Sequence, residues 1–203
     1  MNRRLYGHLT RFASLLLILA PTASFATDGV VLINQSNALA GNVTPGDAAG
    51  FPVTISRPGS YRLSSRLTAP QSTRGIVITA NNVSLDLNGF LLVGNTSCCS
   101  IGGISAGTKT RISVRNGLVA GFAIGINLFN VTAATVENMN VETTGNGAVY
   151  TGTGSLVRGN IFGGTISFQI TCPGVVVDNV FPYPGGNNGF PTATCAKANN
   201  LNF

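Results

Sequence analysis

The fold is decided by a short stretch that begins at residue 112, Ile112-Ser113-Val114-Arg115-Asn116, whose last three residues recur along the chain. A valine, a charged residue and a small amide or glycine return after 22, 21 and 20 residues. The recurrences are Val136-Glu137-Asn138, Val157-Arg158-Gly159 and Val177-Asp178-Asn179, and an earlier copy, Leu85-Asp86, aligns through Leu85. Such a fixed period predicts a structure in which each copy forms one turn.

A second column lies about ten residues upstream of the first and has a similar period. Its members are Gly103-Ile104, Gly125-Ile126, Gly147-Ala148 and Thr165-Ile166, and an earlier copy, Gly75-Ile76, is separated from them by a longer insertion that carries Cys98 and Cys99. Two or three short strands per period, with no helical pattern, predict an all-β, single-stranded, right-handed parallel β-helix of about five coils. Each coil would return ~4.8 Å from its start, and stacked coils would share one core. A β-sandwich is the alternative, but it would need hairpin turns and irregular strand spacing.

Alternation within the stretch predicts which side chains are buried. Ile112, Val114 and Asn116 are expected to point inward, and Ser113 and Arg115 outward. Asparagines at the same inner corner of successive coils can hydrogen-bond to one another, which gives buried amides their partners. The sequence therefore predicts a structural asparagine stack of Asn116, Asn138 and Asn179.

The outward position of the first column carries charges of alternating sign. Its expected members are Asp86, Arg115, Glu137, Arg158 and Asp178. Opposite charges on adjacent strands neutralise one another and fix the register, and this structural interpretation is favoured. Arg115, Glu137 and Arg158 are the catalytic candidates of this column, although a catalytic carboxylate such as Glu137 would normally stay unpaired or have a raised pKa.

Surface contacts for a ligand are the second candidate chemistry. The aromatic residues near turns are expected to fill the core and corners; they are Phe122, Phe129, Phe162, Phe168 and Phe181. Tyr150, which has a polar tip, and Asp178 are weak ligand-binding candidates.

The N-terminal segment has the pattern of a secretory signal. Arg3, Arg4 and Arg11 precede an apolar run over 12–20, and Ser24-Phe25-Ala26 forms a cleavage site, which predicts a signal peptide over 1–26 and a secreted or periplasmic protein. The run is too short to span a membrane. Removal of the signal leaves no histidine and nine basic against six acidic residues, so nucleic-acid binding has little support.

The remaining chain divides into three parts. We expect an N-terminal cap over 27–74 with a short helix at Asn34–Ala40, β-helix coils over 75–181, and a C-terminal segment over 182–203. In an exported protein the cysteines favour disulfides, and Cys172–Cys195 is the expected pair. Cys98 and Cys99 could form a strained ring with each other or pair elsewhere. No metal site is expected, because the chain lacks CxxC spacing and, after signal removal, histidine.

These residues also carry a family resemblance. The run from Gly75 to Phe90, which contains Leu85-Asp86-Leu87-Asn88-Gly89, resembles the opening coil of secreted bacterial right-handed parallel β-helix repeat proteins of the pectate-lyase-like superfold. Residues 51–55 and 58–63, Thr171-Cys172-Pro173, Cys195 and Asn199-Asn200 are similar as well. The resemblance implies an architecture and not a chemistry, because the similar members largely lack an assigned activity.

The expected function is binding of extracellular or envelope polysaccharide without strong catalysis and without a cofactor. A polysaccharide lyase with an arginine base, Arg115 or Arg158, is the first alternative. A structural module of an envelope or appendage assembly is the second. A histidine-dependent hydrolase is disfavoured, because the only histidine is His8 in the signal segment.

Overall fold

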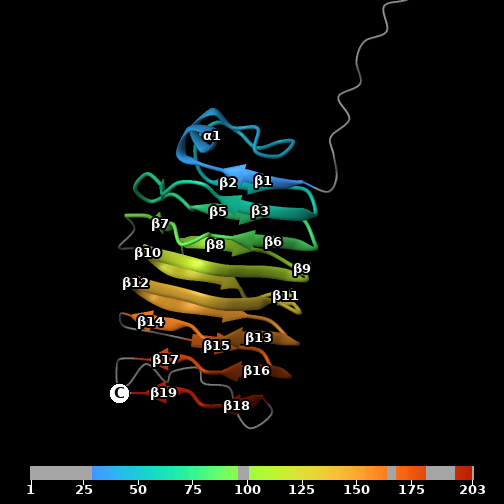
Figure 1. The fold of residues 1–203 in the computed structure, drawn as a ribbon, viewed down its shortest axis with the longest axis vertical. Coiled ribbons are helices and arrows are strands. Elements are labelled where there is room, and N and C mark those ends of the chain that lie inside the picture. Colours follow the sequence, from blue (N-terminus) through green and yellow to red (C-terminus); the bar gives the residue numbers. More distant parts are fainter. Residues whose placement is uncertain (1–28, 96–100, 164–167, 182–194, 203) are drawn as a thin grey trace, which may run out of the picture.

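The chain forms an all-β parallel solenoid of about six turns, as Figure 1 shows in side view. The computed structural model describes residues 29–95, 101–163, 168–181 and 195–202. The expected signal segment therefore lies outside the described residues, as do Cys98, Cys99 and the Thr165-Ile166 member of the second column. Every described strand pairing is parallel, which confirms the β-helix predicted from the repeat.

Each turn passes through three stacks of parallel strands, and two long strands, β10 (Ile112–Leu128) and β12 (Thr135–Thr151), each contribute to all three. The first stack also contains β1 (Val30–Ile33), β3 (Gly59–Leu63), β6 (Val83–Asp86), β13 (Ser155–Arg158), β16 (Gly174–Val177) and β18 (Ala196–Ala198). The second contains β4 (Leu67–Thr68), β7 (Leu91–Val93), β14 (Ile161–Gly163), β17 (Val180–Phe181) and β19 (Leu201–Asn202). The third contains β2 (Val53–Ile55), β5 (Ile76–Ile78), β8 (Gly102–Ala106) and β15 (Phe168–Ile170). β9 (Lys109–Thr110) and β11 (Val131–Thr132) form a separate two-stranded sheet in the turns between the third and first stacks.

The solenoid has about six turns and not five, because strand pairing begins earlier than the repeat signal. β2, β3 and β4 pair in register with β5, β6 and β7 and so form one more full turn over residues 53–68. These strands lie within the segment expected as the N-terminal cap, and the runs Val53-Thr54-Ile55 and Tyr61-Arg62-Leu63 alternate between buried and more exposed side chains as strands do. The expected short helix is also present as α1 (Gln35–Ala40), with Asn34 as its N-cap, and it lies over the N-terminal end of the stack (Figure 1).

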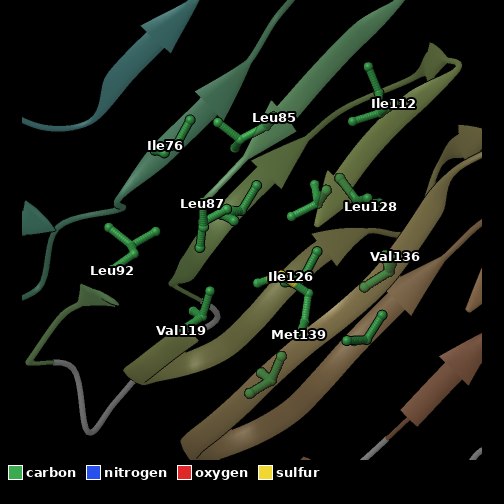
Figure 2. Close-up of a cluster of buried hydrophobic side chains, with 14 of the residues drawn as sticks. Ile76, Leu85, Leu87, Leu92, Ile112, Val119, Ile126, Leu128, Val136 and Met139 are labelled. Atoms are coloured by element: carbon green, nitrogen blue, oxygen red, sulfur yellow. The ribbon is translucent and has the colours of Figure 1, made fainter. Parts of the chain in front are cut away.

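The core lies inside the coil, where one side chain from each turn stacks on the next. Val114 and Val136 face Leu85 and Val157 across adjacent strands, and all four are fully buried. Figure 2 shows the same arrangement around Ile76, Ile126 and Leu128, whose side chains point to one interior. Ser113 and Arg115 face outward as expected, because side chains alternate along a strand.

Aromatic side chains fill the C-terminal half of this interior. Phe162, Phe168 and Phe181 are buried, and the centroids of their rings are 5.1–5.7 Å apart. Phe122 is also buried, so these four residues are core fillers as expected. Phe129 differs: it lies in a turn after β10 and is 42% exposed.

Candidate functional site

The alternating charges form a ladder on the outer side of the first stack. Asp86, Arg115, Glu137 and Arg158 are direct neighbours on successive strands, as the sequence predicted. Arg62 of β3 precedes Asp86 in the same column. It was missed because the repeat signal was followed only from residue 75 onward.

Within this charge ladder, each carboxylate lies near an arginine of an adjacent turn. The Asp86 carboxylate is 3.4 Å from Arg115 Nε and 3.7 Å from an Arg62 terminal nitrogen. Glu137 is 2.7 Å from a terminal nitrogen of Arg158. The arginine side chains are about half exposed, with values of 41–54%, whereas the two carboxylates are mostly covered. This geometry fits ion pairs that hold neighbouring strands in register.

Asp86 has the most crowded carboxylate of the ladder. Burial raises its pKa, but three hydrogen bonds and the positive charge of Arg115 outweigh burial, so the pKa of Asp86 lies below its ordinary value. The donors are the Asn88 N–H at 2.8 Å, the Asn116 side-chain amide at 3.3 Å and Arg115 Nε at 3.4 Å. The carboxylate is therefore held in its charged form, which is unlike a general acid.

Asp178 is not a member of the charge ladder, which corrects the register predicted from sequence. Arg158 faces Val177 and not Asp178, so this turn is one residue shorter than the Val-X-Asn pattern indicated. Asp178 instead occupies a left-handed corner position directly after its first-stack strand, with φ of 58°. Asn116, Asn138 and Gly159 hold the same position with φ between 52° and 64°. Glycine, asparagine and aspartate are the residues that tolerate this conformation.

The predicted asparagine stack is therefore two separate features. Asn116 and Asn138 lie at the outer corner, where the Asn138 amide donates to Asn116 Oδ1 at 3.4 Å and Asn116 in turn donates to Asp86. Asn179 lies one position further along and is fully buried, so it belongs to an inner column with Asn160 and Asn200.

The inner asparagine ladder satisfies buried backbone groups at the corner. Asn179 Oδ1 accepts from both the Asn160 N–H and the Asn160 side-chain amide at 3.0 and 2.9 Å. The Asn179 amide donates to Val157 O at 3.0 Å and to Asn200 Oδ1 at 3.0 Å. Because every bond stays within the corner, this ladder is structural.

A shallow hollow of about 440 Å³ lies beside the charge ladder, at the corner between the first and second stacks. Asn116, Asn138 and Asn140 line it together with the exposed apolar side chains of Leu118 and Ile161. Arg115, Glu137 and Arg158 are not among its lining residues. The structure thus brings the three weak catalytic candidates together as an ion-pair ladder, but it does not place them in a cleft.

Tyr150 lies on a different surface, the outer side of the third stack. Its neighbours in register are Asn127 on the preceding turn and Gln169 on the following turn, and Ser105 precedes Asn127. We call Ser105, Asn127, Tyr150 and Gln169 the outer polar row. Tyr150 is half-buried because its phenol ring lies against Gly147: a Cβ added to Gly147 would meet Tyr150 Oη at less than van der Waals distance.

Two hollows adjoin the outer polar row. The first, of about 230 Å³, contains Ser105 and Asn127 together with Arg74 and Val77. The second, of about 370 Å³, lies in the turns that follow the third-stack strands and is lined by Thr108, Phe129, Asn130, Val131, Thr132, Gly152, Thr153 and Thr171. The alternation of the third-stack strands could have identified these side chains as outward-facing, but not which of them lie side by side on successive turns. The row was missed because the repeat analysis followed the glycine–isoleucine column, whose side chains face the interior.

The cysteine prediction is confirmed for one pair. Cys172 and Cys195 form a disulfide that closes a loop with a sequence separation of 23. Within the described residues, His, Cys, Asp and Glu side chains nowhere gather in a group that could hold a metal ion. No helix in the described part of the chain has the length and apolar character needed to cross a membrane.

The chain was compared with protein-family models, curated proteins and solved structures. No protein-family model, no curated protein and no solved structure matches this chain. What the chain is shown to be is a parallel β-solenoid of about six turns.

Proposed function

We propose that this protein is an exported β-helix protein that binds an extracellular or cell-envelope polysaccharide along the outer polar row, without strong catalysis. The observation that carries the proposal is the row itself: Ser105, Asn127, Tyr150 and Gln169 stand on four successive turns. Adjacent strands are about 4.8 Å apart, so the row offers a hydrogen-bonding group at each step along the axis.

The chemistry of the row fits a sugar polymer. A sugar ring has hydroxyl groups around its edge and apolar C–H faces, so amides and hydroxyls contact the edge and an aromatic ring contacts the face. Tyr150 presents its phenol ring over Gly147, and Phe129 is exposed beside a group of threonines in the adjoining hollow. An extended chain would lie along the solenoid axis and contact several turns at once.

The resemblance to secreted bacterial β-helix proteins and the signal pattern over 1–26 support export. We therefore place the protein outside the cytoplasm, where it would meet such polymers. The pectate-lyase-like superfold is part of this proposal, because it rests on the similar sequence stretches at 51–63 and 75–90.

The lyase alternative gains no support from the charge ladder. Neither Arg115 nor Arg158 lines the hollow beside the ladder, where a polysaccharide could be held. Arg115 and Arg158 each lie beside a carboxylate of the ladder.

The test is binding to an array of acidic and neutral polysaccharides, followed by titration calorimetry with the best glycan. Tyr150→Ala is expected to weaken binding by about tenfold, from the loss of one stacking contact. Glu142→Ala is the matched control, because Glu142 is exposed on the second stack and away from the row. If the protein binds none of the polysaccharides, the proposal is refuted. If Tyr150→Ala and Glu142→Ala bind the glycan with equal affinity, the binding site does not include Tyr150.

A further inference from the structure

β1 is the N-terminal edge strand of the first stack, and β3 is its only partner among the described strands. The Ser64 N–H donates to Ile33 O at 2.9 Å, so the peptide groups of Val31 and Ile33 face β3. Peptide groups alternate in direction along a strand, so those of Val30 and Leu32 face away from it. The Leu32 carbonyl accepts from the Asn37 side-chain amide at 3.3 Å, whereas no described strand covers the Val30 peptide group or the Leu32 N–H.

The side chains of this edge are apolar and exposed. Val30, Val31 and Leu32 are 47%, 37% and 52% exposed, although Val31 lies in the inward column above Tyr61. Residues 29–41 contain no charged side chain. Natural edge strands are commonly protected from pairing by an inward-pointing charge or a proline, and β1 has neither.

The opposite end of the first stack has this protection. In β18 the inward column is occupied by Lys197, which faces Val176 in register. An additional strand at that end would have to cover a lysine. The contrast between Lys197 and Val31, which hold equivalent inward positions at the two ends, marks the edge of β1 as the one open to pairing.

A hollow lies on the inner side of this edge. It has a volume of about 380 Å³; Val31, Val43, Pro45, Pro58 and Tyr61 form the apolar part of its lining, and Arg57 also lines it. Tyr61 Oη donates to the Arg57 carbonyl at 2.8 Å, so its hydroxyl group already has a partner. A side chain pointing inward from a strand added to β1 would enter this hollow.

The cap formed by α1 and its neighbouring loop limits the size of a partner that can pair with β1. Figure 1 shows α1 and its neighbouring loop extending further along the axis than β1, so a second solenoid would meet the cap before its own strands reached the edge. A single extended strand would need only the space beside Gly29–Leu32. We propose that β1 is a docking edge for one extended, uncharged apolar peptide strand from another polypeptide, which pairs with the Val30 peptide group and the Leu32 N–H and places one side chain in the hollow.

This mode gives affinity through main-chain hydrogen bonds and selectivity through the side-chain hollow. The probe is a capped, fluorescently labelled peptide, Gly-Val-Val-Leu-Ile-Asn, and binding to the full chain is measured by fluorescence anisotropy. We expect saturable binding that falls by about tenfold or more when alternate peptide nitrogens are methylated, because hydrogen bonds are lost and the side chains stay the same.

The matched variants are Val31→Lys, which places a lysine where Lys197 lies at the other end, and Val175→Lys. Val175 is 37% exposed, as is Val31, but faces outward on β16, which is paired on both edges. Val31→Lys should abolish binding, and Val175→Lys should leave it unchanged. If Val31→Lys does not fold, the amide chemical shifts of the unmodified protein test the proposal instead. Addition of the peptide should change the shifts of Val30 and Leu32 more than that of Ile33. Absent binding, equal binding of the methylated peptide, or shifts confined to other strands would overturn the proposal.

Discussion

At the scale of single residues, Asn179 is the side chain that connects three turns of the C-terminal corner. Replacement by alanine removes the acceptor of the Asn160 N–H and the donor to Val157 O, and both groups are buried. A buried polar group left without a partner costs about 1–3 kcal/mol, so Asn179→Ala should lower the free energy of unfolding by about 2–5 kcal/mol. Equilibrium urea denaturation measures the difference.

Asn140→Ala is the control for this loss. Asn140 is exposed on the outer side of β12, so its replacement should change the free energy of unfolding by less than about 0.5 kcal/mol. Equal effects of the two substitutions would show that the inner ladder contributes nothing beyond an ordinary surface asparagine.

Asp86 is a single residue that makes the free energy of unfolding depend on pH. Its pKa in the folded chain lies below the ordinary aspartate value, because its hydrogen bonds and Arg115 outweigh burial. As pH falls, the unfolded chain takes up the proton first, at about pH 3.9, so the stabilisation is complete above that value and is lost toward the folded pKa. Asp86→Asn should therefore unfold more easily than the unmodified protein at about pH 6, and the difference should shrink by about pH 3 in parallel urea titrations.

At the scale of elements, the charge ladder should contribute little to stability despite its regularity. The Glu137–Arg158 pair is short at 2.7 Å, but Arg158 is 54% exposed. Exposed pairs contribute about 0.2–1 kcal/mol, so a double-mutant cycle with Glu137→Gln and Arg158→Gln should give a coupling energy in this range. The coupling should fall as salt is added. A coupling well above this range would indicate a desolvated pair with a role beyond strand register.

The strands also show what the sequence could predict and where it could not. The Val-X-Asn repeat identified the stacked strands, because burial requires apolar residues at every second position. It could not separate Asp178 from Asn179, because both residue types tolerate the left-handed corner conformation that Asp178 adopts. The three consecutive valines, Val175–Val177, do not alternate with polar residues, so the sequence does not show which of them faces the core.

A similar one-residue error occurred in the third stack. Ile126 faces Val149 and not Ala148, because β10 and β12 shift register between Ala120 and Ile124. Such an irregularity is set by packing in the turn and leaves no mark in the spacing of glycines. The outer polar row depends on this register, so the side chains that flank Tyr150 could be identified only from the structure.

At the scale of the whole molecule, a solenoid in which each turn contacts only its neighbours should lose structure locally. The Cys172–Cys195 disulfide closes a loop across the last turns, and a loop of this size contributes about 3 kcal/mol in the chain-entropy model. Reduction, or Cys172→Ser, should therefore speed amide hydrogen exchange in 168–181 and 195–202, while exchange in 112–151 stays unchanged. The central turns keep both neighbours, and the last turns lose their covalent constraint. Mass spectrometry of peptic fragments distinguishes the outcomes, since equal acceleration in all fragments would mean that the solenoid opens as one cooperative unit.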